Sequence, residues 1–146
     1  MMLSNTCRYA VRATIYLAVN ASDGRKIGIK KISEDLDIPT PFLGKILQML
    51  AKRGILSSTK GPHGGFGIGK DPNKTTLFEI VDIIDGDDLF NRCLIGVRSC
   101  KDEDKPPCAI HDEYVQIREE IKKLAETASI QNLADNYENA AEKLGL

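Results

Sequence analysis

Three cysteines and one histidine lie close together in the second half of this 146-residue chain. The four side chains are those of Cys93, Cys100, Cys108 and His111. Thiolates and a neutral imidazole are ligands for soft transition metals, and four of them make one complete coordination set. The gaps between them are longer than the spacing of about two to four residues in paired zinc ligands. Long gaps on a loop favour an iron–sulfur cluster, because a cluster fills more room than a single ion.

Two alternatives stay open for this segment. A zinc ion would use the same four ligands, and unliganded thiols would need none. Burial explains Cys100 and Cys108 poorly, because a charged stretch that ends in two prolines separates them. Cys7 stands apart from the group, and we expect it to be a packing residue. Without a secretion signal, clustered cysteines indicate metal or redox chemistry in a reducing cytoplasm rather than disulfides, so we expect a cytoplasmic protein.

The charges divide between the two halves of the chain. Residues 1–75 hold 12 Lys and Arg against 5 Asp and Glu, a net charge of +7, whereas residues 76–146 have a net charge of −8. Lys and Arg contacts to phosphates release counterions, so a basic half is typical of a nucleic-acid binder. The acidic half is expected to face away from the polyanion. The total of −1 hides this division.

Composition limits the architecture to one globular domain, or a domain with an appendage. The chain is 42% hydrophobic and 28% charged, and it contains no long uncharged stretch. At this length a folded chain buries enough surface to be stable without disulfides. We therefore expect no transmembrane helix and no association with a membrane.

Periodic residues predict the elements that carry the basic charge. An amphipathic helix is expected over residues 4–20 and a short helix over residues 30–36. Thr40 at the N-cap and Pro41 at the first helical position predict the start of a third helix, which ends near Gly54. Two helices joined by a tight turn, the second with a basic free face, indicate a helix-turn-helix.

A hairpin follows this motif. Residues 55–60 and 66–70 favour strands, and a turn rich in glycine and proline separates them, as in the wing of a winged helix. We expect the second helix of the helix-turn-helix to face a major groove of DNA. We expect the wing to approach phosphates and a minor groove. The candidate DNA-binding residues are Thr40, Lys45, Gln48, Lys52, Ser57, Ser58, Thr59, Lys60 and His63.

The segment that connects this domain to the C-terminal part has a clear start but little periodicity. Thr76 and Glu79 have the spacing of a capping box, which begins a helix that ends at Gly86. Residues 87–107 show no period and are expected to be an aperiodic loop. That loop holds the three cysteines.

A regular apolar seam comes next and predicts a long helix. The spacing alternates between four and three residues, as along one face of a coiled coil. Its length of about two and a half heptads is too short for an independent coiled coil, so packing on its own domain is the alternative. We favour a dimer contact, since helix-turn-helix proteins commonly bind two half-sites as dimers. The seam residues are Ile110, Tyr114, Ile117, Ile121, Leu124 and Ala128.

These motifs together resemble the Rrf-two (IscR/NsrR-type) family of bacterial iron–sulfur transcription regulators. The resemblance rests on CRYAVRATIYLA, ISEDLDIPTPFLGKILQMLAKRGIL, SSTKGPHGGFGIGK and the cysteine loop that ends CAIH. It implies a winged-helix homodimer held by a long helix. It also implies cluster ligands at Cys93, Cys100 and Cys108, with His111 as the fourth ligand of a 2Fe–2S cluster.

The expected fold is mainly α with a small β-hairpin wing, a winged helix-turn-helix plus a long dimerisation helix. Residues 1–86 form the DNA-binding domain, residues 87–109 the cysteine-bearing sensor loop, and residues 110–146 the dimerisation and C-terminal helices. We expect a homodimeric regulator that binds double-stranded DNA with an affinity set by an iron–sulfur cluster or by the redox state of the same cysteines. A cluster-free winged-helix regulator or a protein-interaction module is the alternative. The sequence contains neither a nucleophile elbow nor a phosphate loop, so we do not expect an enzyme.

Overall fold

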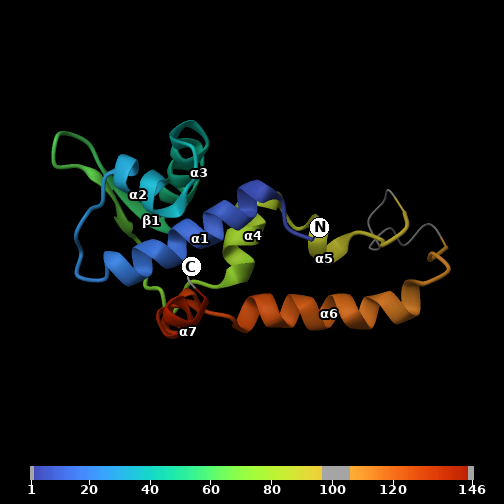
Figure 1. Cartoon of the computed structure of the whole chain (residues 1–146). Helices are drawn as coiled ribbons and strands as arrows, with labels where there is room; N and C mark the ends of the chain where they lie inside the picture. Colours follow the sequence, from blue (N-terminus) through green and yellow to red (C-terminus); the bar gives the residue numbers. More distant parts are fainter. Residues whose placement is uncertain (1, 97–105, 145–146) are drawn as a thin grey trace.

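The computed structural model describes residues 2–96 and 106–144. Within these residues the elements in chain order are α1 (Asn5–Asn20), α2 (Ile29–Leu36), α3 (Thr40–Lys52), β1 (Leu56–Thr59), β2 (Gly65–Ile68), α4 (Leu77–Asp85), α5 (Asp88–Asn91), α6 (His111–Thr127) and α7 (Ile130–Leu144). Figure 1 shows a helical domain with a hairpin at one end and the long helix α6 extending beyond it at the other. The mainly helical fold with one small hairpin confirms the predicted fold class. No helix in the described parts of the chain is long and apolar enough to cross a membrane.

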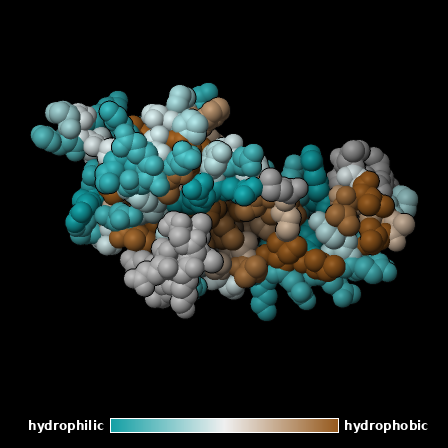
Figure 2. Space-filling view, viewed as in Figure 1, coloured by the Kyte–Doolittle hydropathy of each residue, from teal (hydrophilic) through white to brown (hydrophobic). Residues whose placement is uncertain are grey.

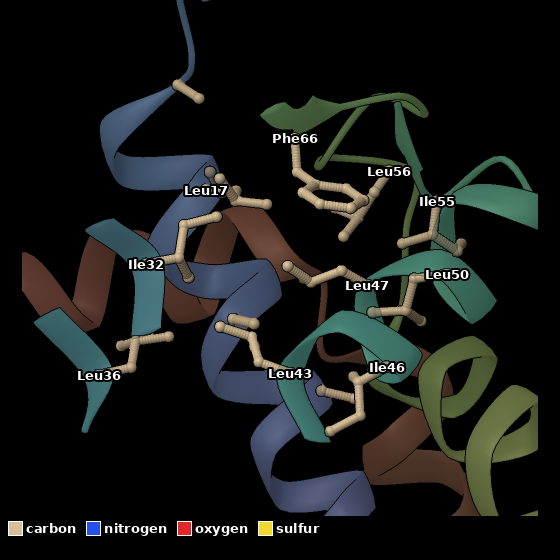
Figure 3. Close-up of a cluster of buried hydrophobic side chains, with 14 of the residues drawn as sticks. Leu17, Ile32, Leu36, Leu43, Ile46, Leu47, Leu50, Ile55, Leu56 and Phe66 are labelled. Carbon is tan, nitrogen blue, oxygen red and sulfur yellow. The ribbon is translucent and has the colours of Figure 1, made fainter. Parts of the chain in front are cut away.

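The core of the domain lies where α1, α2, α3 and the hairpin meet. Small residues on α1 allow the other helices to approach its backbone, and leucines on α3 fill the space between them. Figure 3 shows these side chains converging from α1, α2, α3 and the hairpin, with Phe66 of β2 closing one side. Each fully buried leucine contributes about 1.5–3 kcal/mol relative to an exposed one, so this cluster fixes the orientation of α3.

Backbone conformation sets the turn between α2 and α3. Asp37 ends α2 in the left-handed region with a φ of 53°, which short polar side chains tolerate better than most. Its backbone N–H donates to the carbonyl of Ser33, and Ile38 follows as a buried residue. This confirms a tight turn between the two helices.

The predicted hairpin is present. β1 and β2 pair antiparallel, with Leu56 opposite Ile68 and Thr59 opposite Gly65. Ile27 and Phe66 exchange backbone hydrogen bonds of 2.8 Å, which attach the start of β2 to the segment before α2. The wing is therefore attached to the segment that leads into α2.

A capping box begins α4, as predicted. The backbone N–H of Glu79 donates to the hydroxyl of Thr76 (3.3 Å), and the Glu79 carboxylate accepts from the Thr76 N–H (2.9 Å). Gly86, with a φ of 75°, ends the helix. The expectation of an aperiodic segment from residue 87 to residue 107 is wrong at its start, because α5 forms one short helical turn there. Phe90 of α5 is buried and stacks on Phe78 of α4, a non-local contact that periodicity does not reveal.

Backbone hydrogen bonds attach the link between α6 and α7 to the start of α4. The N–H of Leu77 donates to the carbonyl of Ala128 (2.9 Å), and the N–H of Ile130 donates to the carbonyl of Thr75 (2.8 Å). The Ser129 hydroxyl accepts from the N–H of Asn132 and so caps α7. Helix α7 then packs on α1, where Ile130 joins the core. Helix α6 is thus fixed to the start of α4, and its other end carries the cysteine segment.

Candidate nucleic-acid interface and cysteine segment

Helix α3 has one buried apolar face and one free basic face. Leu43, Ile46, Leu47 and Leu50 are buried in the core. The predicted DNA-contacting side chains of Lys45, Gln48 and Lys52 are exposed together on the other face. An exposed face with cationic and amide groups fits the major groove, where such groups bind base edges and phosphates.

Two apolar residues on the same face were missed by the sequence interpretation. The side chain of Phe42 is 63% exposed and that of Met49 is 40% exposed. Their spacing of three and four residues from Lys45 places all three along one line of the helix. That spacing is visible in the sequence, but only the structure shows that the core does not cover Phe42 and Met49.

The start of α3 differs from the prediction. The N-cap residue is Pro39, without a side-chain cap, and Thr40 is already helical. The Thr40 hydroxyl donates to the hydroxyl of Ser33 (3.1 Å), which in turn donates to the carbonyl of Ile38 (2.5 Å). Thr40 therefore connects α3 to α2 rather than capping its own helix, and it is exposed to solvent.

The wing carries the second group of candidate residues. Ser58, Thr59, Lys60 and His63 are all exposed. Ser57 is half-buried: its hydroxyl accepts a hydrogen bond from the Lys26 ammonium and donates to the carbonyl of Ile68 (3.2 Å). The Ser57 hydroxyl thus has a structural role, and Lys26, which the sequence interpretation did not single out, brings a cation to the base of the wing.

A hollow of about 420 Å³ separates the wing from α3, and Gln48, Ser58 and Lys60 line it. The turn of the wing needs glycines. A Cβ at Gly64 would lie 2.0 Å from the carbonyl oxygen of Thr59, and Gly65 has a φ of 149°. The small turn and the hollow leave the wing and the free face of α3 open on the same side of the molecule.

The cysteine segment begins and ends on described elements. Cys93, just after α5, is 8% exposed, and Cys108 and His111 are half-buried at the start of α6. The N–H of His111 donates to the carbonyl of Cys108 (3.1 Å), so these two residues share one turn of backbone. Cys100 lies outside the described residues. Within the described ranges, no three His, Cys, Asp or Glu side chains form a metal-binding group.

The donor set fits a soft metal centre. Iron–sulfur clusters and zinc prefer thiolate and imidazole ligands, whereas harder cations prefer oxygen ligands. Gly96 lies against the Cys93 thiol, and a Cβ there would come within 3.3 Å of its sulfur. A side chain at this position would therefore crowd the sulfur unless Cys93 shifted slightly. The proposed set of four ligands stays a prediction.

Cys7 differs from the other described cysteines. It is fully buried, and burial, together with the nearby Asp85 carboxylate, raises the pKa of its thiol to about 12. A thiol with this pKa is protonated at neutral pH and is a poor metal ligand. Cys7 is therefore a packing residue, as expected from its position.

The seam of α6 divides into two rows. Tyr114, Ile121 and Ala128 are half-buried, and Ile121 packs beside α4 in an apolar cluster with Val81, Phe90 and Ala125. The other row is exposed: Ile117 is 56% and Leu124 is 64% accessible, and Ile110 is also exposed. Figure 2 shows an apolar band along α6. One chain covers only half of the predicted seam.

Comparison with known proteins places these features in a family. Residues 3–136 match the Rrf2 family, described as iron-dependent transcriptional regulator. An HTH-type transcriptional regulator of Aquifex aeolicus is 33% identical over 133 residues, which are 91% of each chain. The regulator IscR of Klebsiella pneumoniae strain 342 is 30% identical over 138 residues, which are 94% of this chain and 82% of that one.

Solved structures agree on the fold. The structure of CymR, the global cysteine regulator of B. subtilis, has a TM-score of 0.74 at 22% identity, covering 92% of this chain and 96% of that chain. IscR of T. potens has a TM-score of 0.72 at 17% identity, covering 94% and 89%. Because the family match spans nearly the whole chain, the protein belongs to the Rrf2 family of transcriptional regulators.

Proposed function

We propose that the protein is a homodimeric DNA-binding regulator whose affinity for its operator is set by an iron–sulfur cluster, of the 2Fe–2S type, on Cys93, Cys100, Cys108 and His111. The observation that carries the proposal is the contact of the cysteine segment with both the winged-helix domain and α6. The apolar cluster around Phe90 joins the segment that bears Cys93 to α4 of the winged-helix domain and to α6. A change in the cysteine segment therefore acts on both the DNA-binding domain and the long helix.

The DNA side of the proposal rests on the free face of α3 and on the wing. Lys45 and Lys52 bind phosphates or guanine, and Gln48 is suited to adenine. Phe42 and Met49 are placed for contact with thymine methyl groups, since apolar side chains recognise them in the major groove. On the wing, Lys60 and His63 would follow the backbone into the adjacent minor groove.

The dimer side rests on the exposed row of α6. Ile110, Ile117 and Leu124 repeat every seven residues and have no cover within the described part of one chain. A second copy of α6 would bury this row, as in a short coiled coil supported by further contacts. Two recognition helices would then meet two half-sites of DNA.

The sensing side rests on what the described residues do around the cysteines. Cys93 presents a buried thiol beside Gly96, and His111 begins α6 with its ring half-buried. When bound, an iron–sulfur cluster supplies redox-active iron that oxidants can attack. Ligation requires deprotonated thiols and a neutral imidazole, so loading depends on pH. Such a ligand shifts DNA affinity only by its different affinity for the two conformations of the protein.

Anaerobic purification tests this proposal. We expect visible absorbance, with iron and acid-labile sulfide in equal amounts, and loss of all three in Cys108→Ala. Cys7→Ala is the matched control, because it removes a thiol outside the ligand set and should keep the absorbance. A parent protein without iron or sulfide would contradict the cluster. Absence of salt-dependent binding to DNA chosen from a random library would instead support a protein-interaction module.

A thiol switch is the second candidate, favoured by the partial exposure of Cys108 and by the fold shared with the cysteine regulator CymR. It predicts an iron-free protein whose DNA affinity changes on oxidation and recovers with reductant. The same purification separates the two candidates, because only the cluster gives visible absorbance.

A further inference from the structure

Arg118 is a buried cation in the middle of α6. Only 7% of its surface is exposed. One guanidinium nitrogen, Nη1, donates to the carbonyl of Arg92 (3.2 Å), and the group lies 5.9 Å from the centroid of the Tyr114 ring. The Nε atom is buried without any hydrogen-bond partner. A buried arginine with an unpaired donor is uncommon, because native proteins nearly always satisfy such groups.

The charge of Arg118 has no acidic partner among the described residues. The four ion pairs found there all involve other cations. Asp88, the carboxylate nearest in sequence to Arg92, already pairs with that residue at 3.2 Å, and Asp85 is bonded to Ser4. Burying an uncompensated cation is costly, and a cation–π contact recovers only part of that cost.

The position of this charge relates it to the cysteine segment. The carbonyl that Arg118 holds belongs to the peptide bond between Arg92 and Cys93. On α6, Arg118 follows His111 by seven residues and Tyr114 by four, so the three side chains share one face of the helix. Tyr114, Arg92 and Cys93 line one cavity of about 470 Å³. The buried cation thus lies beside the Cys93 end of the proposed ligand set, on the face of α6 that also carries His111.

We propose that Arg118 is the counter-charge of the sensor, a positioning residue whose buried cation stabilises the negative charge of the cluster held by Cys93 and His111. The inference rests on the proposed function. Three thiolates and bridging sulfides give an iron–sulfur centre a net negative charge, and reduction adds one more electron. A nearby buried cation favours the reduced form, because Coulomb interactions are strong where water is excluded. Without a cluster, the same cation is a cost to the fold.

Replacement of Arg118 tests this through two measurements. Arg118→Met should shift the reduction potential of the loaded protein to a more negative value in an anaerobic titration. It should leave the melting temperature of the cluster-free protein unchanged or higher, because it removes an uncompensated buried charge. Arg118→Lys keeps the charge and should retain most of the potential. Arg92→Met is the matched control: this arginine is next to Cys93 but exposed, so its removal should shift the potential less.

Several results would overturn the inference. An unchanged potential in a loaded Arg118→Met protein would do so, as would a lower melting temperature of the cluster-free variant, since Arg118 would then be an ordinary element of the fold. If Arg118→Met folds but takes up no iron, uptake by Arg118→Lys supports the counter-charge and failure of both refutes it. A wild-type protein without iron overturns the proposed function as well, which distinguishes the two failures.

Discussion

Glu79 shows how one side chain can serve a local and a distant contact. Its carboxylate accepts from the Thr76 N–H at the start of α4 and from the Lys70 ammonium at the end of the wing. Burial raises the pKa of the Glu79 carboxyl. The hydrogen bonds from Lys70 and Thr76 and the charge of Lys70 together lower it by more, so the net pKa is below the usual value. The spacing of Thr76 and Glu79 predicts the capping box. Lys70 was not predicted, because its approach to Glu79 depends on how the wing packs.

Glu79→Gln should destabilise the protein by about 1 kcal/mol at neutral pH, since it removes an ion pair and weakens a cap. A lowered folded-state pKa means that this stability is present above the ordinary pKa of 4.5 and is lost as pH falls through the folded value. The difference between variant and parent in urea unfolding should therefore shrink at acid pH. Asp82→Asn, an exposed change on the same helix, is the control. An equal deficit at neutral and acid pH would refute the assignment.

Helix α6 has different surroundings on its two apolar rows. The row with Ile121 packs into the cluster that joins α4 and α5, whereas the row with Ile117 and Leu124 faces solvent in a single chain. The heptad spacing of the sequence predicts one continuous seam. It does not reveal that the domain itself covers one row, because that depends on the angle at which the link at Ala128 sets α6 against α4.

Ile117→Glu should convert the proposed dimer to a monomer, because it places a charge at the centre of the exposed row. Gln116→Glu introduces the same charge at the neighbouring exposed position and should leave the dimer intact. Sedimentation equilibrium measures both. A parent protein that is monomeric at micromolar concentration, or a dimer unaffected by Ile117→Glu, would show that the row has another function.

The whole molecule separates its charges along the chain. The residues that make up α1 to the wing are net basic, and the C-terminal part, with α4 to α7, is net acidic. In Figure 1 the wing and α3 lie at one end and α6 extends toward the other. A polyanion is therefore attracted to the winged-helix end and repelled from the rest, which orients the protein during encounter.

The salt dependence of DNA binding tests this arrangement. The logarithm of affinity falls linearly with the logarithm of salt concentration, by about 0.9 for each phosphate neutralised. Lys45→Ala and Lys52→Ala should each reduce the slope by about one if the residue binds a phosphate. Lys123→Ala, an exposed change on α6, should leave it unchanged. Fluorescence anisotropy over a range of salt concentrations measures these slopes. Equal effects of the three variants would place the DNA elsewhere.

Local sequence patterns predict the helix-turn-helix, the hairpin and the Thr76 cap, and they also supply the heptad spacing and the candidate ligands. These features depend on backbone conformation and side-chain period over a few residues, and neighbouring residues are sufficient to set both. Only the folded arrangement shows that Ser57 is bonded to Lys26, that Phe42 and Met49 are exposed, that Cys7 lies beside Asp85 and that Arg118 is buried beside the peptide before Cys93. Each of these depends on residues far apart in the chain meeting in one packed arrangement, which no local pattern specifies.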